Sequence, residues 1–192
     1  MPLLARHTPH LYEAGTDEAG RGCLAGPVVA AAVILPPGYQ NDQLRDSKKL
    51  SPERRLSLAQ EIREVAWCYG IAEASVAEIE RYNILQASFL AMHRALDQLQ
   101  PSPTWILVDG NRFVAYPQVG HSCLIKGDDR YLSIAAASVL AKTERDALME
   151  QLAQGYPQYG WQQNKGYPTQ KHRQAIQEHG ICCHHRKTFR LR

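Results

Sequence analysis

The run PVVAAAVIL, residues 27–35, consists of β-branched and other apolar residues and is followed directly by Pro36-Pro37-Gly38. An apolar run of this length that stops at turn residues predicts a buried β-strand followed by a turn. Residues 11–17, just upstream, predict a partner strand, and three glycines between residues 20 and 26 punctuate the connection. This part of the chain therefore predicts two neighbouring strands at the start of the fold.

Helices and strands alternate downstream of this pair. Ser51-Pro52 predicts a helix start, because serine caps a helix and proline suits its first position. The remaining predicted elements are strands at residues 67–74, 104–108 and 121–125, and helices at residues 76–82, 83–99, 131–153 and 169–178. Strands first and then interleaved helices indicate an α/β fold, in which a mixed β-sheet is flanked by helices.

The bulk composition is that of an ordinary globular chain. The sequence has 192 residues, of which 44% are hydrophobic and 21% charged, and this excludes disordered and fibrous classes. A chain of this length predicts a single domain over residues 1–192, with a catalytic core at about residues 11–155 and a C-terminal helical and basic segment at residues 156–192. The net charge of +3 is mildly basic. From residue 161 onward Glu178 is the only acidic side chain, which suits a phosphate backbone or a solvated tail.

The cysteines and the N-terminal residues predict where the protein is found. An odd number of irregularly spaced cysteines is a poor disulfide framework and fits a reducing cytosol; they are Cys23, Cys68, Cys123, Cys182 and Cys183. The first fifteen residues lack the apolar core of a signal peptide, and the sequence contains no apolar run of about 18 residues. We therefore expect a cytoplasmic protein without a membrane span.

Acidic residues recur at the predicted strand ends, each close to a glycine. They are Asp17, Glu18, Asp109 and Asp128. Strand ends form the usual ligand crevice of an open α/β sheet, so these carboxylates are expected to meet there. Clustered carboxylates disfavour ionisation unless a cation neutralises them, and an all-oxygen cluster prefers Mg²⁺ or Mn²⁺. Each acid taken alone is also explained by an ordinary Asp-Gly turn.

Three further segments could bind phosphate or sugar. Gly20-Arg21-Gly22 combines backbone N–H groups that a ligand can approach closely with a guanidinium that forks onto phosphate. Residues 46–50, DSKKL, precede a helix start, and residues 164–169, NKGYPT, place an aromatic ring next to a cation. Taken alone, Gly20-Arg21-Gly22 is better explained as an exposed turn, and each of the other two segments is equally explained as an ordinary loop.

Residues 182–185, Cys-Cys-His-His, suggest zinc only superficially. Four consecutive side chains do not converge easily on a tetrahedral ion, and no second pair of ligands completes a site. We do not expect zinc here.

Taken in order, seven motifs resemble those of the bacterial ribonuclease HII family. They are TDEAGRG (16–22), DSKKL (46–50), VDGN (108–111), KGD (126–128), SIAAASVLAKTERD (133–146), NKGYPT (164–169) and HHRKTF (184–189). The resemblance extends from about Gly15 to Phe189. It implies an RNase H-like fold with a small helical C-terminal portion.

The resemblance also implies a function. It implies endonucleolytic cleavage of the RNA strand of RNA–DNA hybrids, incision 5′ to single ribonucleotides in duplex DNA, and a role in ribonucleotide excision repair. It assigns metal binding and catalysis, with two Mn²⁺ or Mg²⁺ ions, to Asp17, Glu18, Asp109 and Asp128. It assigns substrate contacts to Gly20, Arg21, Gly22 and Tyr167 and, more weakly, to Ser47, Lys48 and Asn111.

Some positions depart from the family pattern or leave a choice open. Cys23 follows Gly-Arg-Gly where many relatives have proline, and Thr188 stands where serine is common. Asp128 and Asp129 form a doublet, and Asp128 is the expected ligand because it directly follows Lys126-Gly127. The C-terminus does not resemble a sliding-clamp binding peptide, and we expect a monomer.

The sequence leaves two alternative functions. One is a noncatalytic module of the same fold that binds RNA–DNA hybrids, which the presence of all four acids disfavours. The other is an integrase-like strand-transfer enzyme. The small size and the Gly-Arg-Gly and KGYPT segments disfavour it.

Overall fold

A mixed five-stranded sheet lies at the centre of the structure, with the strand order β3-β2-β1-β4-β5. The computed structural model describes residues 3–44 and 50–190. The strands are β1 (Glu13–Ala19), β2 (Val28–Ile34), β3 (Cys68–Ala74), β4 (Trp105–Asp109) and β5 (Gly120–Leu124). β2 runs antiparallel to both β1 and β3, whereas β4 runs parallel to both β1 and β5. The predicted mixed sheet is confirmed.

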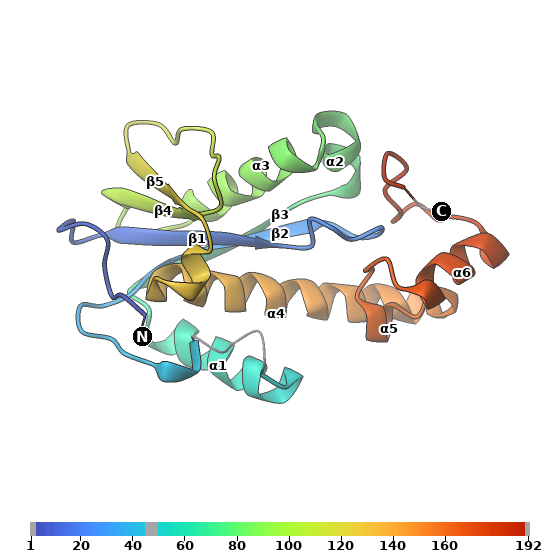
Figure 1. Cartoon of the computed structure of the whole chain (residues 1–192), viewed down its shortest axis with the longest axis horizontal. Helices are drawn as coiled ribbons and strands as arrows, with labels where there is room; N and C mark the ends of the chain where they lie inside the picture. The colour runs from blue at the N-terminus through green and yellow to red at the C-terminus, as the bar shows by residue number, and fades with distance from the viewer. Residues whose placement is uncertain (1–2, 45–49, 191–192) are drawn as a thin grey trace.

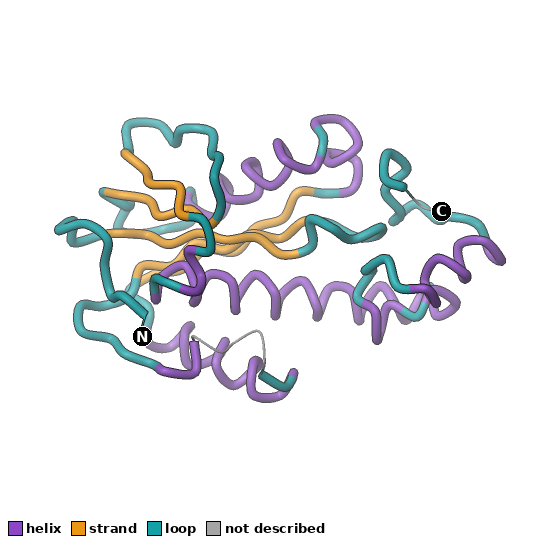
Figure 2. Tube along the Cα trace, viewed as in Figure 1, coloured by secondary structure: helices purple, strands orange, loops and turns teal. Residues whose placement is uncertain are grey.

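Helices cover both faces of this sheet (Figures 1 and 2). The long helix α4 runs along one face with α1 outside it, and α2 and α3 lie on the other face. The helices are α1 (Pro52–Val65), α2 (Val76–Tyr82), α3 (Ile84–Leu96), α4 (Leu132–Gly155), α5 (Trp161–Asn164) and α6 (Gln170–His179). The short 3-10 turns are η1 (Asp42–Leu44), η3 (Gly127–Asp129) and η4 (Pro157–Tyr159).

Strand β2 is buried on both faces, which explains its continuous apolar sequence. Because side chains alternate along a strand, Val28 and Ile34 pack on the α3 side, and Ala31 and Val33 pack on the side of α4 and α1. Alanines between the larger residues let the helices approach closely. The apolar run at residues 27–35 thus contacts the helices on both faces of the sheet.

Gly15 brings α4 against β1. A Cβ atom at this position would lie 2.3 Å from the backbone nitrogen of Ile134 and from the carbonyl carbon of Ser133, so only glycine fits. Direct contact between the two backbones places the next turns of α4 beside the end of β1. The polar residues of α4 therefore reach the acids that follow Gly15 in the strand.

The predicted strands and helices are confirmed, but some of their observed boundaries differ from the predicted ones. β1 continues to Ala19 because it pairs with β2 up to Val29, so Asp17 and Glu18 lie inside the strand rather than at its end. Asp128 does not end a strand but lies in the turn η3. Helix α5 and the 3-10 turns were not predicted, because such short elements carry no periodic pattern. Within the described residues, no helix has the length and apolar character needed to cross a membrane.

Candidate active site

A pocket of about 430 Å³ lies where β1 and β4 end. All four acids that were predicted as ligands line it, as do Gly20, Arg21, Gly22 and Tyr167. These residues come from β1, β4, η3, the loop after β1 and the loop before α6. The pocket therefore gathers residues that are up to 150 positions apart in the sequence.

Asp17 and Asp109 are brought together by the pairing of their strands. β1 and β4 are parallel, and their last paired residues are Thr16 and Val108, so the next residue on each strand is an aspartate. Neighbouring strands are about 4.8 Å apart, so equivalent side chains on one face meet. Asp17 is buried, its carboxylate accepts a hydrogen bond from the Glu18 N–H at 2.7 Å, and Ser138 of α4 also lines the pocket.

Glu18 forms an ion pair with Arg21 of the Gly20–Gly22 loop. The Arg21 guanidinium donates to the Glu18 carboxylate, with 2.9 Å between Nη1 and Oε1. Half of the Arg21 side chain remains exposed, so this cation stands at the entrance of the pocket. The loop and the acids consequently form one surface.

The turn η3 connects Asp128 to Asp109. The backbone N–H of Gly127 donates to Oδ1 of Asp109 at 2.7 Å, and the next residue is Asp128. Asp128 is buried and lines the pocket, whereas its neighbour Asp129 is exposed. Of the doublet, Asp128 is the residue that faces the other acids.

The environment of Asp17 and Glu18 opposes their ionisation. Burial raises the pKa of Asp17 well above its ordinary value, and the negative charges of Glu18 and Asp109 raise it further. Burial also raises the pKa of Glu18, against the opposing charge of Arg21. A bound cation would favour the ionised form of both acids and so oppose these shifts.

The donor set fits a hard divalent ion. Carboxylate oxygens suit Mg²⁺ or Mn²⁺ rather than a soft ion. In residues 3–44 and 50–190, no three His, Cys, Asp or Glu side chains are close enough together to enclose an ion by themselves. Mg²⁺ in proteins commonly keeps several waters and is bound by one or two carboxylates together with substrate phosphate oxygens.

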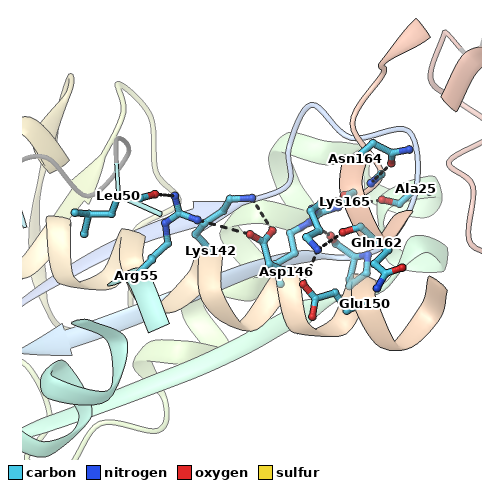
Figure 3. A network of polar contacts seen from close by, with 12 residues as sticks. Ala25, Leu50, Arg55, Lys142, Asp146, Glu150, Gln162, Asn164 and Lys165 are labelled. Carbon is cyan, nitrogen blue, oxygen red and sulfur yellow. Dashed lines mark hydrogen bonds and ion pairs between the residues drawn. The ribbon is translucent and has the colours of Figure 1, made fainter. Parts of the chain in front are cut away.

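Two cations on the pocket wall were not singled out from the sequence. Arg55 of α1 and Lys142 of α4 line the pocket, and Asp146 joins them (Figure 3). The distances are 2.6 Å from Lys142 Nζ to Asp146 Oδ1 and 3.9 Å from Arg55 Nη1 to Asp146 Oδ2. Ser138, Lys142 and Asp146 follow at intervals of four in a helix that is otherwise rich in apolar residues. This spacing, which places them on one helix face, was the available signal.

Tyr167, from the loop before α6, also lines the pocket. Its ring is partly exposed, and the ring centroid lies 5.4 Å from Lys142 Nζ and 5.8 Å from Arg145 Cζ. The thiol of the buried Cys23 lies near its phenol, and burial raises the pKa of both groups. Cys23 therefore packs beneath Tyr167.

The remaining predicted contacts are less well placed. Asn111 is exposed and does not line the pocket. Ser47 and Lys48 lie outside the described residues. These three assignments stay predictions.

The Cys182–His185 segment has a packing role. His185 is buried, accepts from the N–H of Cys182 at 3.1 Å, and approaches His172 with 3.3 Å between the two Nε2 atoms. His172 in turn accepts from Trp161 Nε1 at 3.0 Å. Burial lowers the pKa of both histidines, that of His185 to about 4, so the pair is neutral at physiological pH.

The fold and the acidic pocket define the class of protein first. The structure superimposes on ribonuclease HII of Archaeoglobus fulgidus, solved in complex with PCNA, with a TM-score of 0.77 and 28% identity over 95% of this chain and 96% of that one. The chain thus has the RNase H-like fold, with an all-oxygen acidic site where β1 and β4 end.

Sequence comparison then identifies the family. A family model described as Ribonuclease HII matches residues 14–192. Ribonuclease HII of Bacteroides thetaiotaomicron is 57% identical over 98% of this chain and 94% of that protein. Ribonuclease HII of Parabacteroides distasonis is 58% identical over 93% of this chain and 90% of that protein.

The chain belongs to the ribonuclease HII family. It is a metal-dependent endoribonuclease, a ribonuclease H of type 2, and acts on RNA–DNA hybrids.

Proposed function

We propose that this enzyme incises duplex DNA on the 5′ side of single embedded ribonucleotides, besides cleaving the RNA strand of hybrids. The observation that carries the proposal is the joint lining of one pocket by Asp17, Glu18, Asp109, Asp128 and the Gly20–Gly22 loop. Acids suited to phosphoryl chemistry therefore lie next to a loop whose backbone groups are suited to contact a sugar. The 2′-OH is the group that separates RNA from DNA at one position.

Asp17, Glu18, Asp109 and Asp128 are proposed to hold two Mg²⁺ or Mn²⁺ ions. Such ions, when bound, supply activation of the attacking water and stabilisation of the leaving 3′ oxygen. The reaction would leave a 5′-phosphate and a 3′-hydroxyl. The protein's own part is then to align the strand and to neutralise charge.

Separate residues are proposed to read the two nucleotides at the junction. Gly20, Arg21 and Gly22 contact the ribonucleotide through backbone groups, since glycine lets a ligand approach the main chain closely. Tyr167 stacks on the sugar of the following deoxynucleotide. Lys142, which lies near both the Tyr167 ring and the pocket, is placed to bind a phosphate between them.

The C-terminal segment is proposed to belong to the same functional unit as the core, so that residues 1–192 act as one domain. Tyr167 is the basis for this proposal, because it lies beyond residue 155 and yet lines the pocket. We further propose that the protein works as a cytoplasmic monomer.

A cleavage assay tests the proposed reaction. The substrates are two duplexes of identical sequence, one all-DNA and one with a single ribonucleotide, incubated with Mg²⁺, with Mn²⁺ or with chelator. We expect one incision 5′ to the ribonucleotide, only with metal, and products that a ligase can rejoin. Comparable cutting of the all-DNA duplex would contradict the proposal. Binding without any metal-dependent cutting would favour the hybrid-binding module, and strand joining would favour a strand-transfer enzyme.

Metal should stabilise the protein more strongly at high pH. The raised pKa values of Asp17 and Glu18 mean that the folded state binds more protons than the unfolded state, so metal-free stability falls as pH rises through these values. A divalent ion binds the ionised acids. We expect millimolar Mg²⁺ to raise the Tm by roughly several degrees at pH 8 and by much less at pH 5. Thermal unfolding with Mg²⁺ and with chelator measures this, and equal shifts at both pH values would contradict it.

A further inference from the structure

Two arginines without a carboxylate partner lie behind the Gly20–Gly22 loop. Arg145 of α4 and Arg186 of the C-terminal segment are both fully buried. Within residues 3–44 and 50–190 neither forms an ion pair with an acidic side chain, and their hydrogen bonds all go to main-chain carbonyls. Burying a guanidinium costs free energy unless its N–H groups are hydrogen-bonded, so both arginines depend on these carbonyls remaining in place.

Arg186 fastens both ends of the loop that follows β1. Its Nη1 donates to the carbonyl of Arg21 at 3.0 Å, Nε to that of Gly26 at 2.9 Å, and Nη2 to that of Pro27 at 3.1 Å. Burial lowers the pKa of Arg186 to about 10, so it stays charged at neutral pH.

Arg145 joins the same loop to the segment that carries Tyr167. It donates to the carbonyls of Ala25 at 3.0 Å, Pro27 at 3.1 Å and Lys165 at 2.9 Å. The side of the loop that faces away from the pocket is therefore held by two rigid, planar donors.

The contact with Arg21 determines where Gly22 points its N–H. The Arg21 carbonyl and the Gly22 N–H belong to one peptide group, and in a planar trans peptide they point in opposite directions. Since the carbonyl points at the buried Arg186, the N–H points away from it. Gly22 lines the pocket, and a Cβ atom there would meet nothing within 4 Å. No hydrogen bond from the Gly22 N–H to any group occurs in the described part of the chain.

We propose that Arg186 is a positioning residue for substrate recognition, which aims the Gly22 N–H at the 2′ oxygen of the ribonucleotide. The inference rests on the proposed reading of the 2′-OH by the Gly20–Gly22 loop. The charged hydrogen bond to the Arg21 carbonyl also polarises the peptide and strengthens its N–H as a donor. Through Arg186, the C-terminal segment takes part in distinguishing RNA from DNA.

A binding experiment with two substrates and two proteins tests this role. The affinity of wild type and of Arg186→Met for the single-ribonucleotide duplex and for the all-DNA duplex is measured by fluorescence anisotropy in chelator. Such a cycle isolates the coupling between Arg186 and the 2′-OH from general charge effects. Lys187→Met is the matched control, because Lys187 is the adjacent cation and is exposed.

The expected outcome is a loss of preference rather than of binding. Wild type should prefer the ribonucleotide duplex by about tenfold, and Arg186→Met should reduce the preference to about twofold or less, as for a lost hydrogen bond to a buried acceptor. Lys187→Met should weaken both duplexes equally, as for a lost phosphate contact. Should Arg186→Met fail to fold, Arg186→Lys serves instead. It keeps the charge without the fork and should lower the preference partially, with a changed Gly22 amide proton shift in NMR spectra.

Two results would overturn the inference in different ways. If wild type discriminates and the folded Arg186 variants discriminate equally well, Arg186 has no part in recognition, and the proposed function stands. If wild type binds both duplexes alike, reading of the 2′-OH by the loop fails first, and the role of Arg186 falls with it.

Discussion

Asp17→Asn is expected to abolish cleavage and, in the absence of metal, to make the protein more stable. The substitution keeps the shape of the side chain and removes one negative charge from the centre of the acidic pocket. Because catalysis depends on charge held at fixed positions, we expect a loss of kcat on the order of 10³-fold or more with either Mg²⁺ or Mn²⁺. Single-turnover cleavage of a duplex with one ribonucleotide measures this loss.

The gain in stability follows from the raised pKa of Asp17. Burial and the charges of Glu18 and Asp109 make the ionised form unfavourable in the folded state. The folded protein therefore loses stability as pH rises above the ordinary carboxyl range, and an uncharged amide avoids that loss. In chelator the Tm of Asp17→Asn should exceed that of wild type at pH 8, and the two should converge near pH 4. A lower Tm for the variant at pH 8 would contradict the raised pKa of Asp17.

The aspartate doublet supplies the control for this prediction. Asp128→Asn should lower activity strongly, because Asp128 lines the pocket beside Asp109. Asp129→Asn changes an exposed neighbour and should leave cleavage within about twofold of wild type, since surface substitutions usually have small effects. The reverse ranking would move the fourth ligand by one residue.

The acids could be located from the sequence because local patterns place them. Each lies near a recognisable strand and a glycine. The parallel pairing of β1 and β4 then places Asp17 beside Asp109. The elements around them could be predicted for the same reason, since alternating or helical periodicity is a local property. The boundary of β1 was misplaced by two residues at each end, because pairing with β2 rather than composition determines where it stops.

The supporting residues could not be predicted in this way. Arg145 and Arg186 are charged, and a charged residue is ordinarily taken to be on the surface. Their burial depends on carbonyls that a loop distant in sequence presents, and no periodicity records that arrangement. Arg55 was overlooked for a similar reason, since its place beside Lys142 and Asp146 depends on how α1 packs on α4 (Figure 3).

Gly20→Ala is expected to have the second large effect, because this glycine touches one of the buried arginines directly. A Cβ atom at Gly20 would lie 1.9 Å from Nε of Arg145, and the backbone there has a φ of +96°. Arg145 Nε already donates to the carbonyl of Pro27, so the guanidinium cannot move aside without breaking its hydrogen bonds. We expect a loss of about 3 kcal/mol in the free energy of unfolding from strain and overpacking together. Displacing the loop by roughly 1 Å should lower kcat/KM for the single-ribonucleotide duplex by about 100-fold.

Gly38→Ala separates the strain at Gly20 from the clash. Gly38 has a φ of +82°, and a Cβ atom there would meet nothing within 4 Å, so alanine brings only the cost of the left-handed backbone, about 1 kcal/mol. Its activity should match wild type because it lies outside the pocket. Chemical denaturation and steady-state cleavage of both variants make the comparison. If Gly20→Ala is as stable and as active as Gly38→Ala, the loop can move off Arg145 freely, and the buried arginines do not hold it in place. If Gly20→Ala alone loses both stability and activity, the loop that we propose to contact the ribonucleotide is held rigidly by Arg145 behind it.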